Sequence, residues 1–137
     1  MREILFRGQT RRKGEKVRIS GEPVDSNWVY GGIFPGEGDF SIIYQTKPKI
    51  EKFTVYSDTV GQYTGMKDIH GVKIFEGDIV NYNGSCHKVV FESRNGTGYF
   101  GIVVGENETW GFGHSTPAYM MAVVGNIYDN PDLLEVS

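Results

Sequence analysis

The sequence is poor in residues that crosslink a chain or anchor it in a membrane. It contains one cysteine, Cys86, so no disulfide can form within the chain, and a reducing compartment is the expected setting. No apolar run approaches the 18 or more residues of a membrane-spanning helix, and Ile4–Phe6 is too short for a signal peptide. We therefore expect a soluble, cytoplasmic protein that does not bind membranes.

Basic residues are absent from the C-terminal part of the chain. No Lys or Arg follows Arg94, whereas residues 1–18 hold seven basic and two acidic side chains. The net charge of -3 argues against a uniformly basic nucleic-acid-binding protein. The basic segment, which includes Arg11, Arg12 and Lys13, allows three interpretations. It can be a solvated hairpin, a patch for nucleic acid, or a segment attracted to the acidic end of the same chain or of another subunit.

Catalytic and metal-binding motifs are also lacking. The three histidines show no ligand spacing and no cysteine pair accompanies them, which argues against a zinc site. Cys86 and His87 are adjacent on an expected strand, so their side chains point to opposite faces and cannot form a nucleophile–base pair. Neither G-x-G-x-x-G nor G-x-x-x-x-G-K-[ST] occurs. We therefore expect no enzyme, no cofactor and no metal.

Glycine and aromatic residues are abundant instead. The 19 glycines are roughly double the average usage of about 7%. Aromatic residues, at 13%, argue against disorder because large rings must be buried somewhere. Short apolar stretches that alternate with turn residues predict a mainly β protein, a small barrel or roll.

The alternation of apolar and polar residues places the expected strands. They occupy residues 2–7, 16–19, 28–30, 40–44, 52–56, 78–82, 86–92, 99–104 and 119–124. Asn83-Gly84 and Asn95-Gly96 predict hairpin turns, because Asn and Gly accept positive φ. Asn130–Leu134 predicts a short C-terminal helical turn.

Three acidic residues, Asp68, Glu76 and Asp78, are close enough in sequence to share one face. Such a cluster can bind a metal ion, but carboxylates beside glycines also accept hydrogen bonds from the backbone of turns. We favour the role in turns and leave metal binding as the weaker alternative.

Two regions contain candidate binding residues. Trp28 and Tyr30 lie in the same half as the basic segment, and aromatic residues near basic ones are typical of single-stranded nucleic-acid binding. The glycine-rich stretch 105–117 is expected to be a long mobile loop. Within it, Trp110 is either a buried lid residue or a binding contact.

Three sequence blocks resemble those of one known protein family. They are MREILFR at residues 1–7, TVGQYTGMKDIHGVKIFEGDIV at residues 59–80, and VGNIYDNPDLL at residues 124–134. Together they resemble the YopX family of phage and prophage proteins. The resemblance implies a mainly β protein whose second half is similar to an SH3-type barrel, in a phage or prophage setting within a bacterial host. It implies no biochemical activity and no catalytic residues.

These observations predict two halves: residues 1–58, β-rich with the basic segment, and residues 59–137, the SH3-like part. We expect a phage or prophage accessory protein that is a non-catalytic interaction module, forms a homo-oligomer and binds a further protein. The alternative is a nucleic-acid-associated protein of phage replication or transcription. The candidate binding residues are Arg11, Arg12, Lys13, Trp28, Tyr30 and Trp110.

Overall fold

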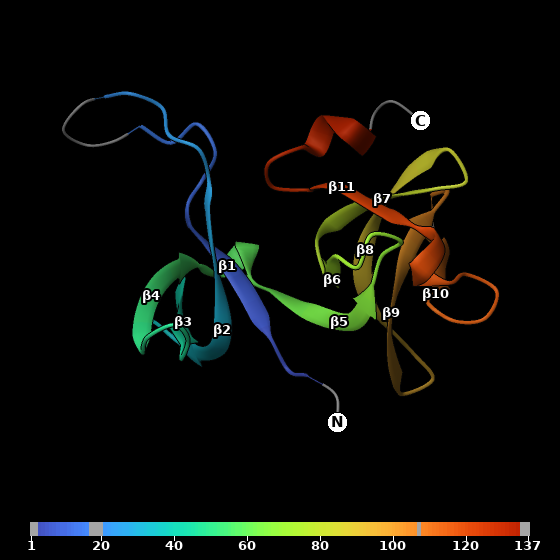
Figure 1. Ribbon diagram of the computed structural model, residues 1–137, viewed down its shortest axis with the longest axis horizontal. Coiled ribbons are helices and arrows are strands. Elements are labelled where there is room, and N and C mark those ends of the chain that lie inside the picture. Colours follow the sequence, from blue (N-terminus) through green and yellow to red (C-terminus); the bar gives the residue numbers. More distant parts are fainter. Residues whose placement is uncertain (1–2, 17–20, 107, 135–137) are drawn as a thin grey trace. The chain divides into compact units, whose positions relative to one another are not determined.

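The computed structural model describes residues 3–16, 21–106 and 108–134. These residues form strands and short 3-10 turns but no α-helix, so the protein is all-β (Figure 1). The strands are β1 (Phe6–Arg11), β2 (Asn27–Pro35), β3 (Phe40–Gln45), β4 (Glu51–Tyr56), β5 (Gly61–Lys67), β6 (Lys73–Phe75), β7 (Asp78–Tyr82), β8 (Ser85–Arg94), β9 (Thr97–Val104), β10 (Glu108–Gly111) and β11 (Ala122–Asn126). The 3-10 turns are η1 (Ser57–Thr59), η2 (Ala118–Met120) and η3 (Pro131–Leu134).

The chain forms two compact units, Met1–Tyr63 and Thr64–Ser137, and the division between them falls within β5. The strands form two antiparallel sheets, with the orders β4-β3-β2-β1-β5-β6 and β10-β9-β8-β7-β11. The expected closed barrel is not observed in the described part of the chain, because the outermost strands of each sheet are not hydrogen-bonded to each other. In the first sheet, β1 pairs with β2 on one side and, at Phe6 and Arg7, with β5 on the other.

The core of the first unit lies on the inner face of β2, β3 and β4. Val29, Ile43 and Val55 are buried there, and partly buried apolar side chains surround them. Gly8 in β1 packs directly against this core: a Cβ atom at this position would lie 2.8 Å from Cγ2 of Val55. Glycine therefore allows β1 to approach Val55, which a side chain would prevent.

Strand β1 begins and ends later than the sequence predicts. The strand was expected at residues 2–7 with a polar turn after it, but the polar residues up to Arg11 are paired. Gln9 is buried, and its backbone N–H donates a hydrogen bond to Oγ1 of Thr59 at 2.9 Å. Contacts far along the chain thus draw a polar segment into the sheet. The strand expected at residues 16–19 lies largely outside the described residues.

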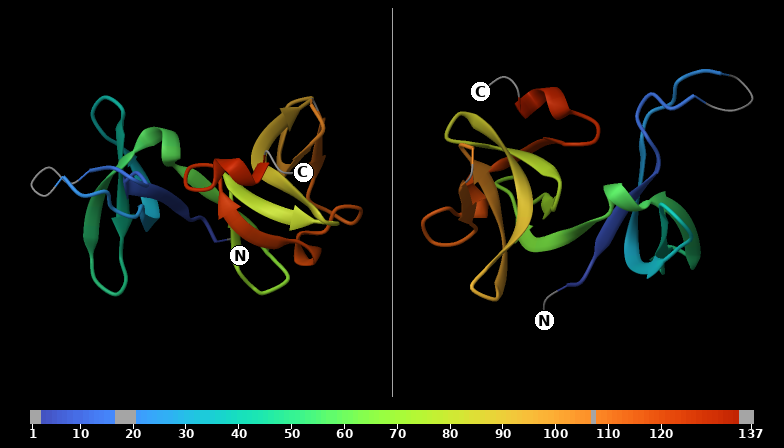
Figure 2. Two further views of the ribbon diagram at one scale, coloured as in Figure 1. Left: turned by 90° about the horizontal axis from the view of Figure 1, so that it is seen from above. Right: turned by 180° about the vertical axis from the view of Figure 1, so that it is seen from behind.

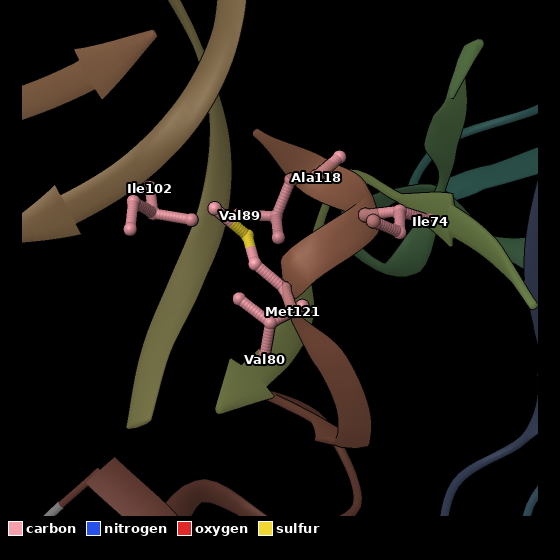
Figure 3. Close-up of a cluster of buried hydrophobic side chains, with 6 residues drawn as sticks. All are labelled: Ile74, Val80, Val89, Ile102, Ala118 and Met121. Carbon is pink, nitrogen blue, oxygen red and sulfur yellow. The ribbon is translucent and has the colours of Figure 1, made fainter. Parts of the chain in front are cut away.

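The core of the second unit is a cluster of six buried side chains from several strands and η2. They are Ile74, Val80, Val89, Ile102, Ala118 and Met121 (Figure 3). Figure 3 shows the Met121 side chain directed toward Val89. An unbranched Met side chain adapts to the space between strands, so Met121 closes this core from the segment after η2.

Both predicted hairpin turns are confirmed. Asn83 and Gly84 have φ of 53° and 85° between β7 and β8, and Asn95 and Gly96 have 54° and 79° between β8 and β9 (Figure 2). Positive φ at both central residues matches the right-handed twist of the strands that the turn joins.

The stretch 105–117 is more ordered than the predicted mobile loop. Glu108–Gly111 forms β10, which pairs with β9 so that Trp110 is opposite Ile102. Gly101 makes this pairing possible, because a Cβ there would lie 2.3 Å from the carbonyl oxygen of Trp110. At the C-terminal end, η3 forms where the sequence predicts a short helical turn. No helix in the described ranges is both long and apolar enough to cross a membrane.

Candidate functional site

The outer face of the first unit's sheet carries a group of aromatic side chains. In β2, Val29 and Ile33 pack in the core, so Trp28, Tyr30 and Phe34 lie on the opposite face. The register extends this face across the sheet, since Gly32 pairs with Tyr44 and Phe34 with Ile42, and Phe40 pairs with Tyr56. We call this surface the aromatic face: Trp28, Tyr30, Phe34, Phe40, Ile42, Tyr44 and Tyr56.

The rings of the aromatic face contact one another in two pairs. Phe34 and Tyr44 pack edge to face with centroids 6.0 Å apart, and Phe40 and Tyr56 are tilted with centroids 5.3 Å apart. These contacts restrain the rings. Phe34 nevertheless remains 51% exposed, and Tyr30 and Phe40 are exposed as well. The aromatic rings of this face are therefore restrained by packing but remain accessible to a ligand.

Two arginines stack on the aromatic face. The guanidinium carbon of Arg7 lies 4.5 Å from the Trp28 ring centroid, and that of Arg12 lies 4.1 Å from the Tyr56 centroid. Arg12 also donates from Nη2 to Oδ1 of Asp58 at 3.0 Å, an exposed ion pair. Because Asp58 balances the Arg12 charge, this end of the face is less positive than the composition of the basic segment suggests.

Glu15 joins the same end of the face through the Tyr56 hydroxyl, which donates to its Oε1 at 2.6 Å. This hydrogen bond, together with one from the backbone N–H of Arg12, holds the pKa of Glu15 below its ordinary value. The same bond to Glu15 raises the pKa of Tyr56, and burial adds to that effect. Glu15, Arg12, Tyr56 and Asp58 form one polar network beside β4.

The structure places the predicted binding residues in three settings. Arg11 and Lys13 are exposed at and just beyond the end of β1, whereas Arg12 is engaged by Asp58 and Tyr56. Trp28 and Tyr30 share the aromatic face.

Trp110 belongs to the second unit and lies on the short strand β10. It is 43% exposed and donates from Nε1 to Oε1 of Glu108 at 2.9 Å, so it is not a buried lid.

Sequence reasoning missed Arg7, Phe34 and Phe40 as members of this surface. The signal is the spacing by two: residues 28, 30 and 34 are aromatic in β2, and 40 and 44 in β3. Glycines at 31 and 32 interrupt the pattern in β2 and suggested a turn, although the strand continues to Pro35.

The second unit contains a turn between β5 and β6 that is organised by a buried carboxylate. Oδ1 of Asp68 accepts hydrogen bonds from the backbone N–H groups of His70 and Val72, and Oδ2 accepts one from Val123. Burial by itself raises the pKa of Asp68, but these three bonds, with His70 nearby, outweigh it and the pKa is lowered.

Asp78, another member of the acidic cluster, also accepts a hydrogen bond from the backbone: the N–H of Phe75 donates to its Oδ2 at 2.8 Å. In the described ranges no three His, Cys, Asp or Glu side chains are arranged to hold a metal ion. The structure supports the role of Asp68 and Asp78 in turns.

Exposed apolar side chains surround the Asp68 turn. Ile69 and Val72 belong to it, and the backbone N–H of Ile69 donates to the carbonyl of Met121 at 2.8 Å, directly after η2. Tyr119 and Met120 of η2 are exposed too, Tyr119 by 68%. We call Ile69, Val72, Tyr119 and Met120 the turn patch. Exposed apolar side chains gathered on an ordered frame mark an interaction surface.

Cys86 and His87 do not form a catalytic pair. They are successive residues of β8, opposite Asn81 and Val80 of β7, and Nδ1 of His87 lies 3.0 Å from the carbonyl oxygen of Val103. The His87 ring is therefore directed to β9.

Fold and surfaces define an all-β protein with two antiparallel sheets, an aromatic face in one unit and an apolar patch in the other. Residues 36–135 match the family model described as YopX protein, so the chain belongs to the YopX family. The crystal structure of protein EF1440 from Enterococcus faecalis is similar in fold, with a TM-score of 0.50 and 22% sequence identity over 98% of this chain and 99% of that one. No curated protein matches the sequence.

Proposed function

We propose that this protein is a non-catalytic interaction module that self-assembles through the turn patch, as an accessory protein of a phage or prophage in the cytoplasm of its bacterial host. The observation that carries the proposal is the turn patch itself. Ile69 and Val72 are exposed on a turn held by Asp68, whose carboxylate accepts three backbone hydrogen bonds, and Tyr119 and Met120 are exposed on η2. Resemblance to the YopX family supports an SH3-type arrangement of the second unit, and small β modules of that type commonly serve as binding modules.

A second copy of the chain is the partner that the patch fits best. A two-fold symmetric contact places the same apolar surface on both sides, so Ile69 and Met120 of one copy meet apolar side chains of the other. Residues 64–137 carry nine acidic and four basic side chains. Two such units repel each other at low salt, and apolar contacts have to overcome that repulsion.

The effect of salt on assembly distinguishes contact through the turn patch from the alternative, in which the basic N-terminal segment binds the acidic end of another copy. Assembly through the turn patch is unchanged or strengthened when salt screens the repulsion. Docking of the basic N-terminal segment on the acidic end of another copy weakens with salt, because opposite charges drive it.

Light scattering after size-exclusion chromatography, at micromolar protein and at two salt concentrations, tests the proposal. We expect a dimer for the wild-type protein and for Ile50→Asp, a matched control at an exposed apolar position in the first unit. Met120→Asp and Ile69→Asp should give folded monomers, because each dimer would then bury an unpaired carboxylate twice. A monomeric wild-type protein, or dissociation by Ile50→Asp as well, would rule out assembly through this patch.

A further inference from the structure

The strand positions that share the aromatic face contain basic residues but no carboxylate. Alternation and register place twelve residues of β1 to β4 on it. They are Arg7, Gln9, Trp28, Tyr30, Gly32, Phe34, Phe40, Ile42, Tyr44, Lys52, Thr54 and Tyr56. The acidic residue of β4, Glu51, has the opposite parity and lies on the other face. Aromatic rings and basic residues at these strand positions suit a ligand that is aromatic and anionic, and the carboxylates of Glu15 and Asp58 lie at the Tyr56 end of the face.

Basic residues lie in two neighbouring cross-strand rows of this face. Arg7 is opposite Tyr30, Gly32 is opposite Tyr44, and Tyr44 is opposite Lys52. Arg7 is buried and stacks on Trp28, whereas Lys52 is exposed. One row, Arg7–Tyr30, and the next, Gly32–Tyr44–Lys52, therefore each place an aromatic ring beside a cationic group.

Gly32 leaves open space beside Tyr44 in the second of these rows. A Cβ atom at this position would meet no atom within 4 Å, and φ is not in the left-handed region. A hollow of about 470 Å³ is lined here by Tyr30, Gly32, Tyr44 and Lys47, with Glu3 also in its wall. A second hollow of about 570 Å³ lies beside Phe40 and Ile42 on the same face. Flat rings beside open hollows can accept further flat rings.

We propose that the aromatic face binds single-stranded nucleic acid without reading a defined sequence. Bases stack on Tyr30 and Phe34 and enter the hollow over Gly32, while Lys47 and Lys52 contact phosphates. Stacking of bases on exposed aromatic rings beside a basic track is the usual mode of such binding. A duplex does not fit, because its bases are already stacked on one another and expose only edges and backbone.

A proline-rich peptide also stacks on aromatic side chains, but it does not require positive charge at the rim or the absence of carboxylates. The basic residues Arg7, Lys47 and Lys52 thus favour a polyanion over a peptide. Each hollow also has one carboxylate in its wall, Glu3 in the first and Glu37 in the second, so Glu3→Gln should strengthen binding.

Fluorescence anisotropy with a labelled oligothymidylate of about twelve nucleotides tests the proposal at low and at physiological salt. We expect binding that weakens as salt increases. Tyr30→Ala and Phe34→Ala should each weaken it roughly 5- to 100-fold. Lys52→Gln should reduce the slope of log K against log salt by about one unit. Phe91→Ala, which removes a ring of the second unit that is 50% exposed and lies outside the turn patch, is the matched control and should leave binding unchanged.

Three outcomes would overturn the proposal: no binding of the oligonucleotide at low salt, equal weakening by Phe91→Ala, or binding of a proline-rich peptide in place of the oligonucleotide. Tyr30→Leu keeps an apolar side chain and removes the aromatic ring, so it separates stacking from a general loss of apolar surface. Circular dichroism and the unfolding midpoint of each variant check that the sheet remains folded. The test is independent of self-assembly, which uses residues of the second unit.

Discussion

Oδ2 of Asp68 lies 2.9 Å from the backbone nitrogen of Val123, although 55 positions separate the two residues in the sequence. This hydrogen bond joins the β5–β6 turn to β11, and the other oxygen of the same carboxylate bonds His70 and Val72 within the turn. One buried side chain thus determines both the shape of the turn and its attachment to the second sheet. The turn patch depends on this arrangement.

Asp68→Asn should destabilise the protein by about 2–3 kcal/mol, since hydrogen bonds to a buried charged group are among the stronger ones. The amide retains one acceptor oxygen, and its NH2 group faces a backbone donor where an acceptor stood. Urea unfolding followed by circular dichroism measures the change. Asp132→Asn, an exposed carboxylate of η3, is the matched control and should have little effect. Equal stability of both variants would contradict the role of Asp68.

Stability should decrease in acid. The native pKa values of Asp68 and Glu15 are lower than in the unfolded chain, so folding favours their ionised forms. Their contribution is present above the unfolded pKa of about 4 and is lost as the pH falls through the lowered native values. Unfolding free energy measured from neutral to acidic pH should show this loss, and Asp68→Asn should reduce its size. A variant with the wild-type pH profile would show that Asp68 does not contribute.

Gly8→Ala should destabilise the first unit by about 1–3 kcal/mol. Its methyl group would lie 2.8 Å from Cγ2 of Val55, closer than van der Waals contact allows. Val55→Ala alone leaves a cavity in the core and is also destabilising. In the double variant the two changes compensate, so the combined loss should be smaller than the sum of the single losses. Additive losses in thermal or urea unfolding would mean that the two residues do not interact.

Gly84→Ala should cost about 1 kcal/mol, because φ at this residue is 85° and an L side chain is strained there. Gly32→Ala is the control: no atom lies within 4 Å of the new Cβ, and its φ is ordinary for a strand. We expect Gly32→Ala to be neutral or slightly stabilising in the same unfolding experiment. If both variants lost the same stability, the positive φ at Gly84 would not be the cause.

Much of the fold is encoded locally. Alternation predicts β3, β4 and the strands β7 to β9, and Asn-Gly pairs predict the two hairpin turns, because both signals depend on neighbouring residues. The resemblance of residues 59–80 and 124–134 to the YopX family is likewise carried by short motifs, which can be read from neighbouring residues. Three of the seven residues of the aromatic face could also be predicted, since Trp28, Tyr30 and Tyr44 recur at even positions of predicted strands.

Only the tertiary structure decided the remainder. Gln9 is polar and Trp110 lies among glycines, yet both are in strands. The backbone of Gln9 is bonded to Thr59, far along the chain, and Trp110 pairs with Ile102. Barrel closure depends in the same way on pairing between the outermost strands of a sheet, and no such pairing is present among the described residues. The aromatic face combines residues of several strands, and register decides which of their side chains share it. By itself, then, the sequence determined the turns, most strands and the class of fold, which are local properties, while pairing partners and shared faces depend on contacts that no short segment contains.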